Sequence, residues 1–160
     1  MNILLFFKRY KSVLRWLPAL CFAIAIFNFS ATPGDELEQS YHSITTTIQT
    51  ISTATTAPST TPWAVPTPSN IDWLKVGHVI GYFGLGFTVL YAMSAHSRWN
   101  PSIALILCCL YSFTDEFHQI FTPGRSASPR DLLIDTLAAL IGVTIMLGVI
   151  ASRKHFEKNL

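Results

Sequence analysis

Ionisable side chains lie inside the hydrophobic stretches of this chain, and this placement limits what the chain can fold into. Lys75, His78, Asp115, Glu116 and Asp135 fall within or beside segments that otherwise have the composition of membrane-spanning helices. An ionisable group in hydrocarbon is costly, so such groups usually face a bundle interior or a wet cavity and pair with one another. The sequence therefore predicts a membrane protein with an internal polar site.

The composition agrees with a membrane protein and excludes several other classes. Of the 160 residues, 50% are hydrophobic and 12% are charged, which is about half the charged fraction of an ordinary soluble domain. The formal net charge of +2 gives no reason to expect a nucleic acid as a partner. Cys21, Cys108 and Cys109 lack the spacing of a zinc knuckle or a disulfide framework. The sequence assigns neither a cofactor nor a set of metal ligands.

Four hydrophobic stretches predict an all-α membrane protein with four transmembrane helices. They cover residues 13–29, 71–95, 100–121 and 128–151, and the last three are long enough to cross a hydrocarbon core of ~30 Å. Asn100-Pro101 and Ser128-Pro129 each offer an N-cap followed by proline at a helix start. The basic residues before the first stretch are typical of a signal peptide, but no small-x-small cleavage site follows Phe29, so we expect a retained helix.

Composition divides the chain into four segments. They are an N-terminal transmembrane helix with a basic start (1–31), an extracytoplasmic loop (32–70), a three-helix core (71–151) and a basic tail (152–160). In the loop, apolar residues recur at helical spacing over 35–51, which predicts an amphipathic helix on the outer membrane surface. The alternative is a disordered spacer, because Ser and Thr are poor helix formers. Residues 52–69 are rich in Thr, Ser and Pro, which is typical of an extended linker.

The distribution of lysine and arginine predicts the orientation. Both termini are basic, whereas residues 30–70 contain no Lys or Arg. The positive-inside rule then puts both termini in the cytoplasm and the 30–70 loop outside. Arg125 and Arg130 lie on the outer side against this rule. We therefore expect them to serve a ligand or Asp135.

The polar residues of the last three helices meet at one depth. Because a helix rises about 1.5 Å per residue, all of them lie in the outer third of the bilayer. They are Lys75, His78 and Tyr82 near the start of the second helix, Asp115, Glu116 and Gln119 near the end of the third, and Asp131 and Asp135 near the start of the fourth. With Arg125 and Arg130, these residues form the predicted ligand-binding site.

Structural explanations compete with a functional role at several of these positions. Asp131 occupies the capping-box position of its helix, and Lys75 can extend its ammonium group to the interface. Asp135 is deeper, and we expect it to pair with Arg125, Lys75 or His78. The adjacent carboxylates Asp115 and Glu116 are the hardest to explain, because two carboxylates in a transmembrane helix need cations, a metal or protonation.

One face of the second helix predicts close packing. Gly77, Gly81 and Gly84 share the side opposite to Lys75 and His78. Small residues at this spacing let a neighbouring helix approach closely in a membrane. We therefore expect another helix to lie against the glycines.

Three sequence elements, in this order, resemble those of the VanZ-like membrane family. Lys75-Val-Gly-His78-Val-Ile-Gly-Tyr82-Phe-Gly-Leu-Gly86-Phe is similar to the family's K-x-x-H-x-x-x-Y-x-x-L-G-F element. Residues 111–125 are similar to D-E-x-x-Q-x-x-x-P-G-R, and residues 128–139 to D-x-x-x-[ND]. The resemblance covers residues 73–142. The chain departs from the family pattern at Leu74, where an Asp is frequent, and at Ala138, where a Gly is common.

The resemblance implies a four-helix protein of the bacterial inner membrane that acts in the cell envelope. The founding member of the family is associated with low-level resistance to the glycopeptide teicoplanin. The resemblance therefore also implies a link to glycopeptide susceptibility, but it supplies no reaction.

Three functions remain open at this stage. The first is an envelope factor that binds an anionic lipid-linked precursor or a phospholipid headgroup, with Lys75, His78, Arg125 and Arg130 contacting phosphate. The second is an intramembrane hydrolase or transferase whose catalytic candidates are Asp115, Glu116 and His78, helped by His118, as acid and base or as ligands of a divalent metal. The third is a structural or assembly protein whose charges only lock the helices together. We favour the first over the second by a small margin.

Overall fold

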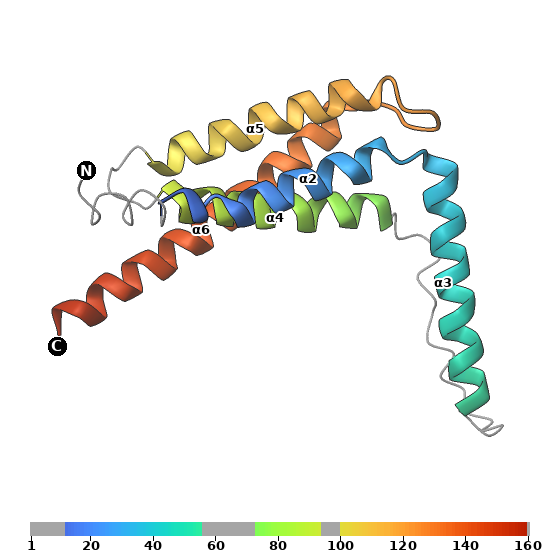
Figure 1. The fold of residues 1–160 in the computed structure, drawn as a ribbon, viewed down its shortest axis with the longest axis horizontal. Coiled ribbons are helices and arrows are strands. Elements are labelled where there is room, and N and C mark those ends of the chain that lie inside the picture. Colours follow the sequence, from blue (N-terminus) through green and yellow to red (C-terminus); the bar gives the residue numbers. More distant parts are fainter. Residues whose placement is uncertain (1–11, 56–72, 94–99, 160) are drawn as a thin grey trace, which may run out of the picture.

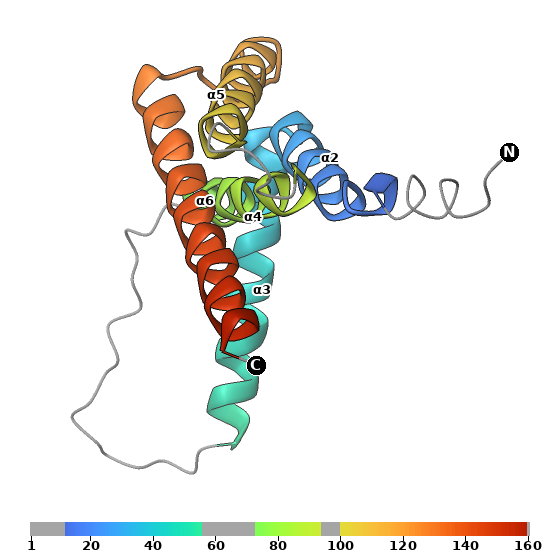
Figure 2. The same cartoon turned by 90° about the vertical axis from the view of Figure 1, so that its left-hand side faces the viewer.

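The computed structural model describes residues 12–55, 73–93 and 100–159, and every regular element among them is a helix (Figure 1). The helices are α2 (Leu17–Ala31), α3 (Gly34–Thr55), α4 (Trp73–Met93), α5 (Asn100–Gln119) and α6 (Pro129–Lys158). Figures 1 and 2 show α2, α4 and α5 gathered side by side, with α6 crossing them obliquely. The predicted all-helical class is confirmed.

Three helices of the described part of the chain are long and apolar enough to cross a membrane. They cover Ser12–Ala31, Lys75–Met93 and Pro129–Lys158. With 20 residues, α5 has the length of a span. Because it ends in the polar sequence Thr-Asp-Glu-Phe-His-Gln, the mean hydropathy of its most apolar stretch is lower than that of the other three helices. The fourth predicted span therefore stays a prediction.

Large apolar side chains cover the outside of the helices, and polar side chains lie inside. On α5, Leu110, Phe113 and Phe117 are each more than half exposed, whereas Ser112 and Asp115 are buried. A water-soluble protein has the opposite distribution, because burying its apolar side chains drives its folding. The arrangement suits helices that are surrounded by lipid.

The glycine face of α4 packs directly against α2. The side chains of Phe29, Ile26 and Phe22 lie over Gly77, Gly81 and Gly84, respectively. A Cβ atom added at Gly77 or Gly81 would come within 2.8 Å of these side chains. The predicted close-packing face is therefore confirmed, and it brings the end of α2 beside the polar start of α4.

Glycines also allow α4 and α6 to approach each other closely. A Cβ atom added at Gly142 would collide with the carbonyl oxygen of Phe83, and one added at Gly86 would collide with that of Ala139. The two backbones are thus nearly in contact along this crossing. Two turns before Gly142, the same packing holds Asp135 against α4.

The structure extends two predicted elements. The helix α6 continues to Lys158 rather than ending near 151, so the basic residues of the predicted tail lie on its last turns. The helix α3 contains the predicted segment 35–51 and continues through 52–55, which we expected to be extended. The rest of the predicted linker, like the basic start at 1–11, lies outside the described residues.

Serine and threonine do not interrupt α3, because their hydroxyls bond within the helix. Ser40, Thr47 and Thr50 each donate to the carbonyl oxygen four residues earlier, at 2.8 to 2.9 Å. A hydroxyl that is bonded in this way does not offer the backbone an alternative to its helical hydrogen bonds. Figures 1 and 2 both show α3 running across the end of the bundle, roughly perpendicular to α4.

The close crossing of α4 and α6 gives a testable prediction. The variant Gly142→Ala should lower the free energy of unfolding by about 1–3 kcal/mol, because its methyl group meets the backbone of Phe83. Gly148→Ala on the same helix is the matched control, since no atom lies within 4 Å of a Cβ atom there. It should leave stability unchanged or raise it by up to about 1 kcal/mol through helix propensity. Thermal unfolding of the purified protein in detergent measures both, and equal effects would contradict the prediction.

Candidate functional site

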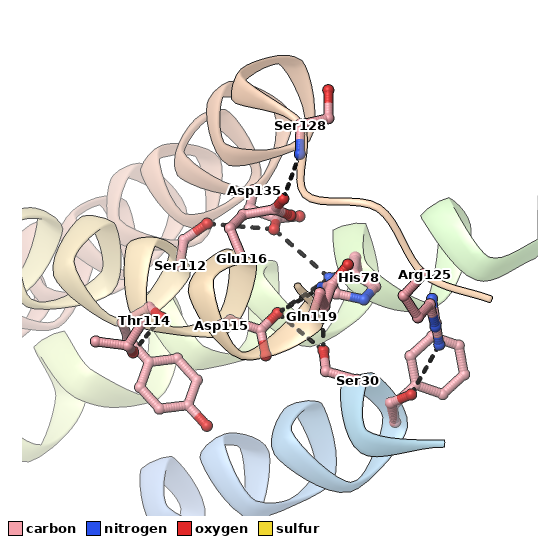
Figure 3. A network of polar contacts seen from close by, with 12 residues as sticks. Ser30, His78, Ser112, Thr114, Asp115, Glu116, Gln119, Arg125, Ser128 and Asp135 are labelled. Atoms are coloured by element: carbon pink, nitrogen blue, oxygen red, sulfur yellow. Dashed lines mark hydrogen bonds and ion pairs between the residues drawn. The ribbon is translucent and has the colours of Figure 1, made fainter. Parts of the chain in front are cut away.

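Polar side chains from four helices meet at one end of the bundle. This end contains the end of α2, the start of α4, the end of α5 and the start of α6, and α3 runs across it (Figure 1). The structure thus gathers these residues at one end of the bundle, and their depth in a bilayer stays a prediction. Figure 3 shows how the side chains lie.

His78, Asp115 and Asp135 form the centre of this region, and we call them the buried triad. The Nδ1 atom of His78 lies 3.6 Å from Oδ2 of Asp115 and 3.5 Å from Oδ2 of Asp135. The exposed fractions of the three residues are 9%, 3% and 1%. Each comes from a different helix, and both carboxylates are directed toward the imidazole (Figure 3). His78 is one of the three partners expected for Asp135, and the structure places the two side chains together.

Neutral side chains hold the two carboxylates in place. Asp115 Oδ2 accepts hydrogen bonds from the Ser30 hydroxyl at 2.9 Å and from the Gln119 amide at 3.2 Å. Asp135 Oδ2 accepts from the Ser112 hydroxyl at 3.2 Å. Ser30 belongs to α2, which the sequence analysis did not connect with the site. The signal that could have found it is its depth, since it lies at the outer end of the first hydrophobic stretch.

Three buried polar atoms in this region have no hydrogen-bond partner among the described residues. They are Oδ1 of Asp115, the hydroxyl of Tyr82 and Oδ1 of Asp131, which lies 3.6 Å from Lys75 Nζ. Tyr82 is fully buried, with its ring 6.1 Å from that of His78 and 6.2 Å from that of Tyr111, measured between centroids. Leaving such an atom unpaired costs roughly 1–3 kcal/mol, so all three atoms have hydrogen-bonding capacity to spare.

Asp115 and Glu116, which we expected to act as a pair, point to different partners. Glu116 Oε2 accepts a hydrogen bond from the backbone N–H of Ser128 at 2.7 Å. Neighbouring side chains on a helix diverge by about 100°, so the two carboxylates of a D-E sequence leave the helix in different directions. Ser128 in turn caps α6, as predicted, by accepting from the N–H of Arg130 at 3.2 Å. Glu116 therefore fixes the start of α6.

Arg125 ties the loop before α6 to the end of α2. Its guanidinium donates to the carbonyl oxygens of Phe29, at 2.8 Å, and Thr32, at 3.4 Å, and lies 5.5 Å from the centroid of the Phe29 ring. The N–H of Gly34 also donates to the carbonyl of Pro123 at 3.2 Å. Cations are favoured at a helix C-terminus, where carbonyl groups lack partners. Arg125 is thus a positioning residue here, and its contact with a ligand stays a prediction.

A cavity of about 210 Å³ opens beside the triad. It is lined by Lys75, His78, Glu116, Gln119, Gly124, Arg125, Ser126, Asp131, Ile134 and Asp135. At its edge, Lys75 Nζ lies 3.6 Å from Asp131 Oδ1. Most of the predicted site residues therefore share one wall. Asp115 and Tyr82 are buried beside the cavity without lining it, and Arg130 is exposed and lies outside the lining.

The link between α2 and the triad can be tested with a double-mutant cycle. Ser30→Ala and Asp115→Ala should each destabilise the protein, and their effects should differ from additivity by about 1 kcal/mol, because they remove the same hydrogen bond. Ser30→Ala with Ser112→Ala is the control cycle, since these hydroxyls bond to different carboxylates. Unfolding in detergent micelles measures both cycles, and additivity within about 0.5 kcal/mol in the first would contradict the contact.

Comparison with known proteins agrees with this geometry. No curated protein and no solved structure matches the chain. A family model described as VanZ/LLP1 matches residues 15–151, so the match takes in α2 as well as the stretch that carries the three motifs. It includes every residue of the cavity wall and of the triad. Because this match spans most of the chain and its helices are apolar, the chain belongs to the VanZ/LLP1 family and is a multi-pass membrane protein of VanZ type.

Proposed function

We propose that this protein binds the phosphorylated headgroup of a phospholipid or of a lipid-linked envelope precursor at the outer face of the bacterial inner membrane. The cavity at the end of the bundle carries the proposal, because its wall is polar and contains both Lys75 and Arg125. A hydrocarbon chain attached to the headgroup would remain among the apolar side chains outside the helices.

The size of the cavity supports a headgroup rather than a larger molecule. Pockets for drug-sized ligands have volumes of about 300–1,000 Å³. The cavity has about 210 Å³, which is room for a phosphate with a small substituent. Its place at the end of the bundle is the depth at which headgroups lie when the helices cross a bilayer.

The charges in the wall favour a ligand that carries both phosphate and hydroxyl groups. Lys75 has a side chain that is 47% exposed, and its Nζ atom lies 3.6 Å from Asp131 Oδ1. Its ammonium group offers three donors on a flexible stem and can turn to a phosphate oxygen. Glu116, Asp131 and Asp135 repel a bare anion but accept hydrogen bonds from hydroxyls. A phosphoglycerol or a sugar phosphate has both the phosphate oxygens that Lys75 can bind and the hydroxyls that can donate to the carboxylates.

The orientation in this proposal follows from charge. The start of α2 and the end of α6 lie at the end of the bundle opposite to the site (Figure 1). Arg153, Lys154 and Lys158 lie near the end of α6, and the positive-inside rule assigns that end to the cytoplasm. Both termini are then cytoplasmic, α5 is the fourth span, and the site faces outward. In this frame α3 lies in the plane of the outer membrane surface.

An intramembrane hydrolase or transferase is the second candidate. It is supported by His78 between two carboxylates at the cavity, since these residue types perform acid–base and metal-assisted chemistry. Two expected participants have other contacts, because Glu116 accepts from Ser128 and His118 stacks on Phe27 with ring centroids 4.8 Å apart. A purely structural role, the third candidate, accounts for the ion pairs between helices but leaves the cavity without a use. An effect on glycopeptide susceptibility is expected where the bound ligand is an envelope precursor.

Headgroup binding is tested by neutralising Lys75. Native mass spectrometry of the full-length protein with phosphatidylglycerol should show binding to wild type that is at least about tenfold weaker in Lys75→Gln, because a charge-assisted hydrogen bond contributes about 1.5–3 kcal/mol. Arg130→Gln is the matched comparison, since it removes one positive charge near the same end from an exposed position outside the lining. We expect it to change binding by less than about twofold. Equal losses in both variants would indicate general surface attraction, and no loss in either would refute the proposal.

The position of α3 is tested separately. Spin labels at Ile44 and Thr46 lie on opposite sides of this helix, because two residues are separated by about 200°. Both side chains are exposed. In nanodiscs, the label at 44 should be the more accessible to oxygen in the lipid, and the label at 46 the more accessible to a water-soluble nickel chelate. Equal accessibility to the chelate would place α3 away from the membrane surface.

A further inference from the structure

We propose that the buried triad of His78, Asp115 and Asp135 binds a divalent metal ion, with zinc and manganese best suited to the site. One ligand atom from each residue, the imidazole nitrogen or a carboxylate oxygen, lies within 4.8 Å of the other two. The three residues come from α4, α5 and α6, so a metal ion would join three helices at one point. The inference concerns metal binding itself and does not depend on the proposed headgroup.

The distances from His78 to the two carboxylates suit metal ligands as well as long hydrogen bonds. An N–H···O hydrogen bond has a donor–acceptor distance of about 2.7–3.2 Å. The two separations at His78 Nδ1 are 3.5 and 3.6 Å. Metal–ligand bonds of about 2.1 Å at tetrahedral angles hold ligand atoms about 3.4 Å apart. Both separations at His78 are therefore close to those between the ligands of one metal ion, and the third pair of ligand atoms lies within 4.8 Å.

Charge balance points the same way. A protonated imidazole neutralises one of the two buried carboxylates and leaves the other, whereas a divalent ion with a neutral imidazole neutralises both. An uncompensated buried charge costs several kcal/mol. The nearby cations have other contacts, since Arg125 donates to carbonyl oxygens of α2 and Lys75 lies 3.6 Å from Asp131. A divalent ion is thus one species that makes this cluster neutral, beside protonation of a carboxylate.

The surroundings of the two carboxylates are those of a built site. In metal sites, ligating carboxylates are themselves held by further hydrogen bonds. Here Ser30 and Gln119 hold Asp115, and Ser112 holds Asp135. Oδ1 of Asp115 is buried without a hydrogen-bond partner among the described residues, so this carboxylate retains an acceptor for a ligand.

The residue types limit the choice of metal. Imidazole suits zinc, iron and nickel, carboxylate oxygens suit manganese and magnesium, and a mixed set is compatible with zinc or manganese. Three protein ligands leave at least one coordination position for water or another oxygen ligand. His78 and Asp135 line the cavity, so that position would face it. An ion here would be reached from the cavity.

The test measures metal binding by the full-length protein in detergent. After treatment with a chelator, the protein is incubated with Zn²⁺ or Mn²⁺ alone, desalted and analysed by elemental mass spectrometry. Wild type should retain about one ion per chain, as a three-ligand site requires. His78→Gln and Asp135→Asn should each bind at least about tenfold more weakly. Glu36→Gln, which removes an exposed carboxylate on α3, should bind as wild type does.

Two further measurements keep the result decisive. Circular dichroism and gel filtration establish that each variant is folded. X-ray absorption of the metal-loaded wild type should show one imidazole nitrogen with oxygen ligands and no sulfur. Folded wild type without stoichiometric metal, equal retention in Asp135→Asn, or sulfur in the coordination shell would each overturn the site. The Lys75→Gln comparison tests the headgroup alone, so failure of either proposal is recognised independently.

Discussion

The placement of two carboxylates inside an apolar bundle is the constraint on which the rest of the structure depends. Asp115 and Asp135 can be buried because His78 lies within 3.6 Å of both and because serine hydroxyls bond to each. These contacts need helices that approach closely. Glycines at the helix crossings, such as Gly81 and Gly86 on α4 and Gly142 on α6, allow that approach, since a larger residue there would meet the neighbouring helix. The close packing and the polar site are thus parts of one arrangement.

The sequence predicts what depends on side-chain pattern. Apolar runs predict the helices, and helical spacing places His78, Asp115 and Asp135 at one depth, where the structure brings them together. Partners that are backbone atoms could not be foreseen, because every residue offers them. Glu116 accepts a hydrogen bond from an N–H group of the loop, and Arg125 donates to carbonyl groups of α2. Such contacts follow from tertiary geometry alone.

The helix α5 shows why the mean hydropathy of a helix and the character of its exposed face are separate properties. Its mean hydropathy is lowered by Asp115, Glu116 and Gln119, all of which are buried against other helices. Its exposed face consists of large apolar side chains such as Phe113 and Phe117. A window average counts both faces equally, but lipid contacts only the exposed one. In a helix that contributes to an internal polar site, the buried polar residues therefore hide an apolar outer face from a window average.

The two proposals are connected through the charge of the cavity wall. Arg125 and Glu116 are engaged by backbone groups, and Lys75 lies beside Asp131, so the triad carries the remaining excess of negative charge. A phosphate entering without a metal ion would approach that excess with Lys75 and Arg125 to attract it. A divalent ion at the triad removes the excess and offers a phosphate oxygen an open coordination position. Anion binding is therefore favoured by the metal ion, whereas the metal ion is held by the triad whether or not an anion is present.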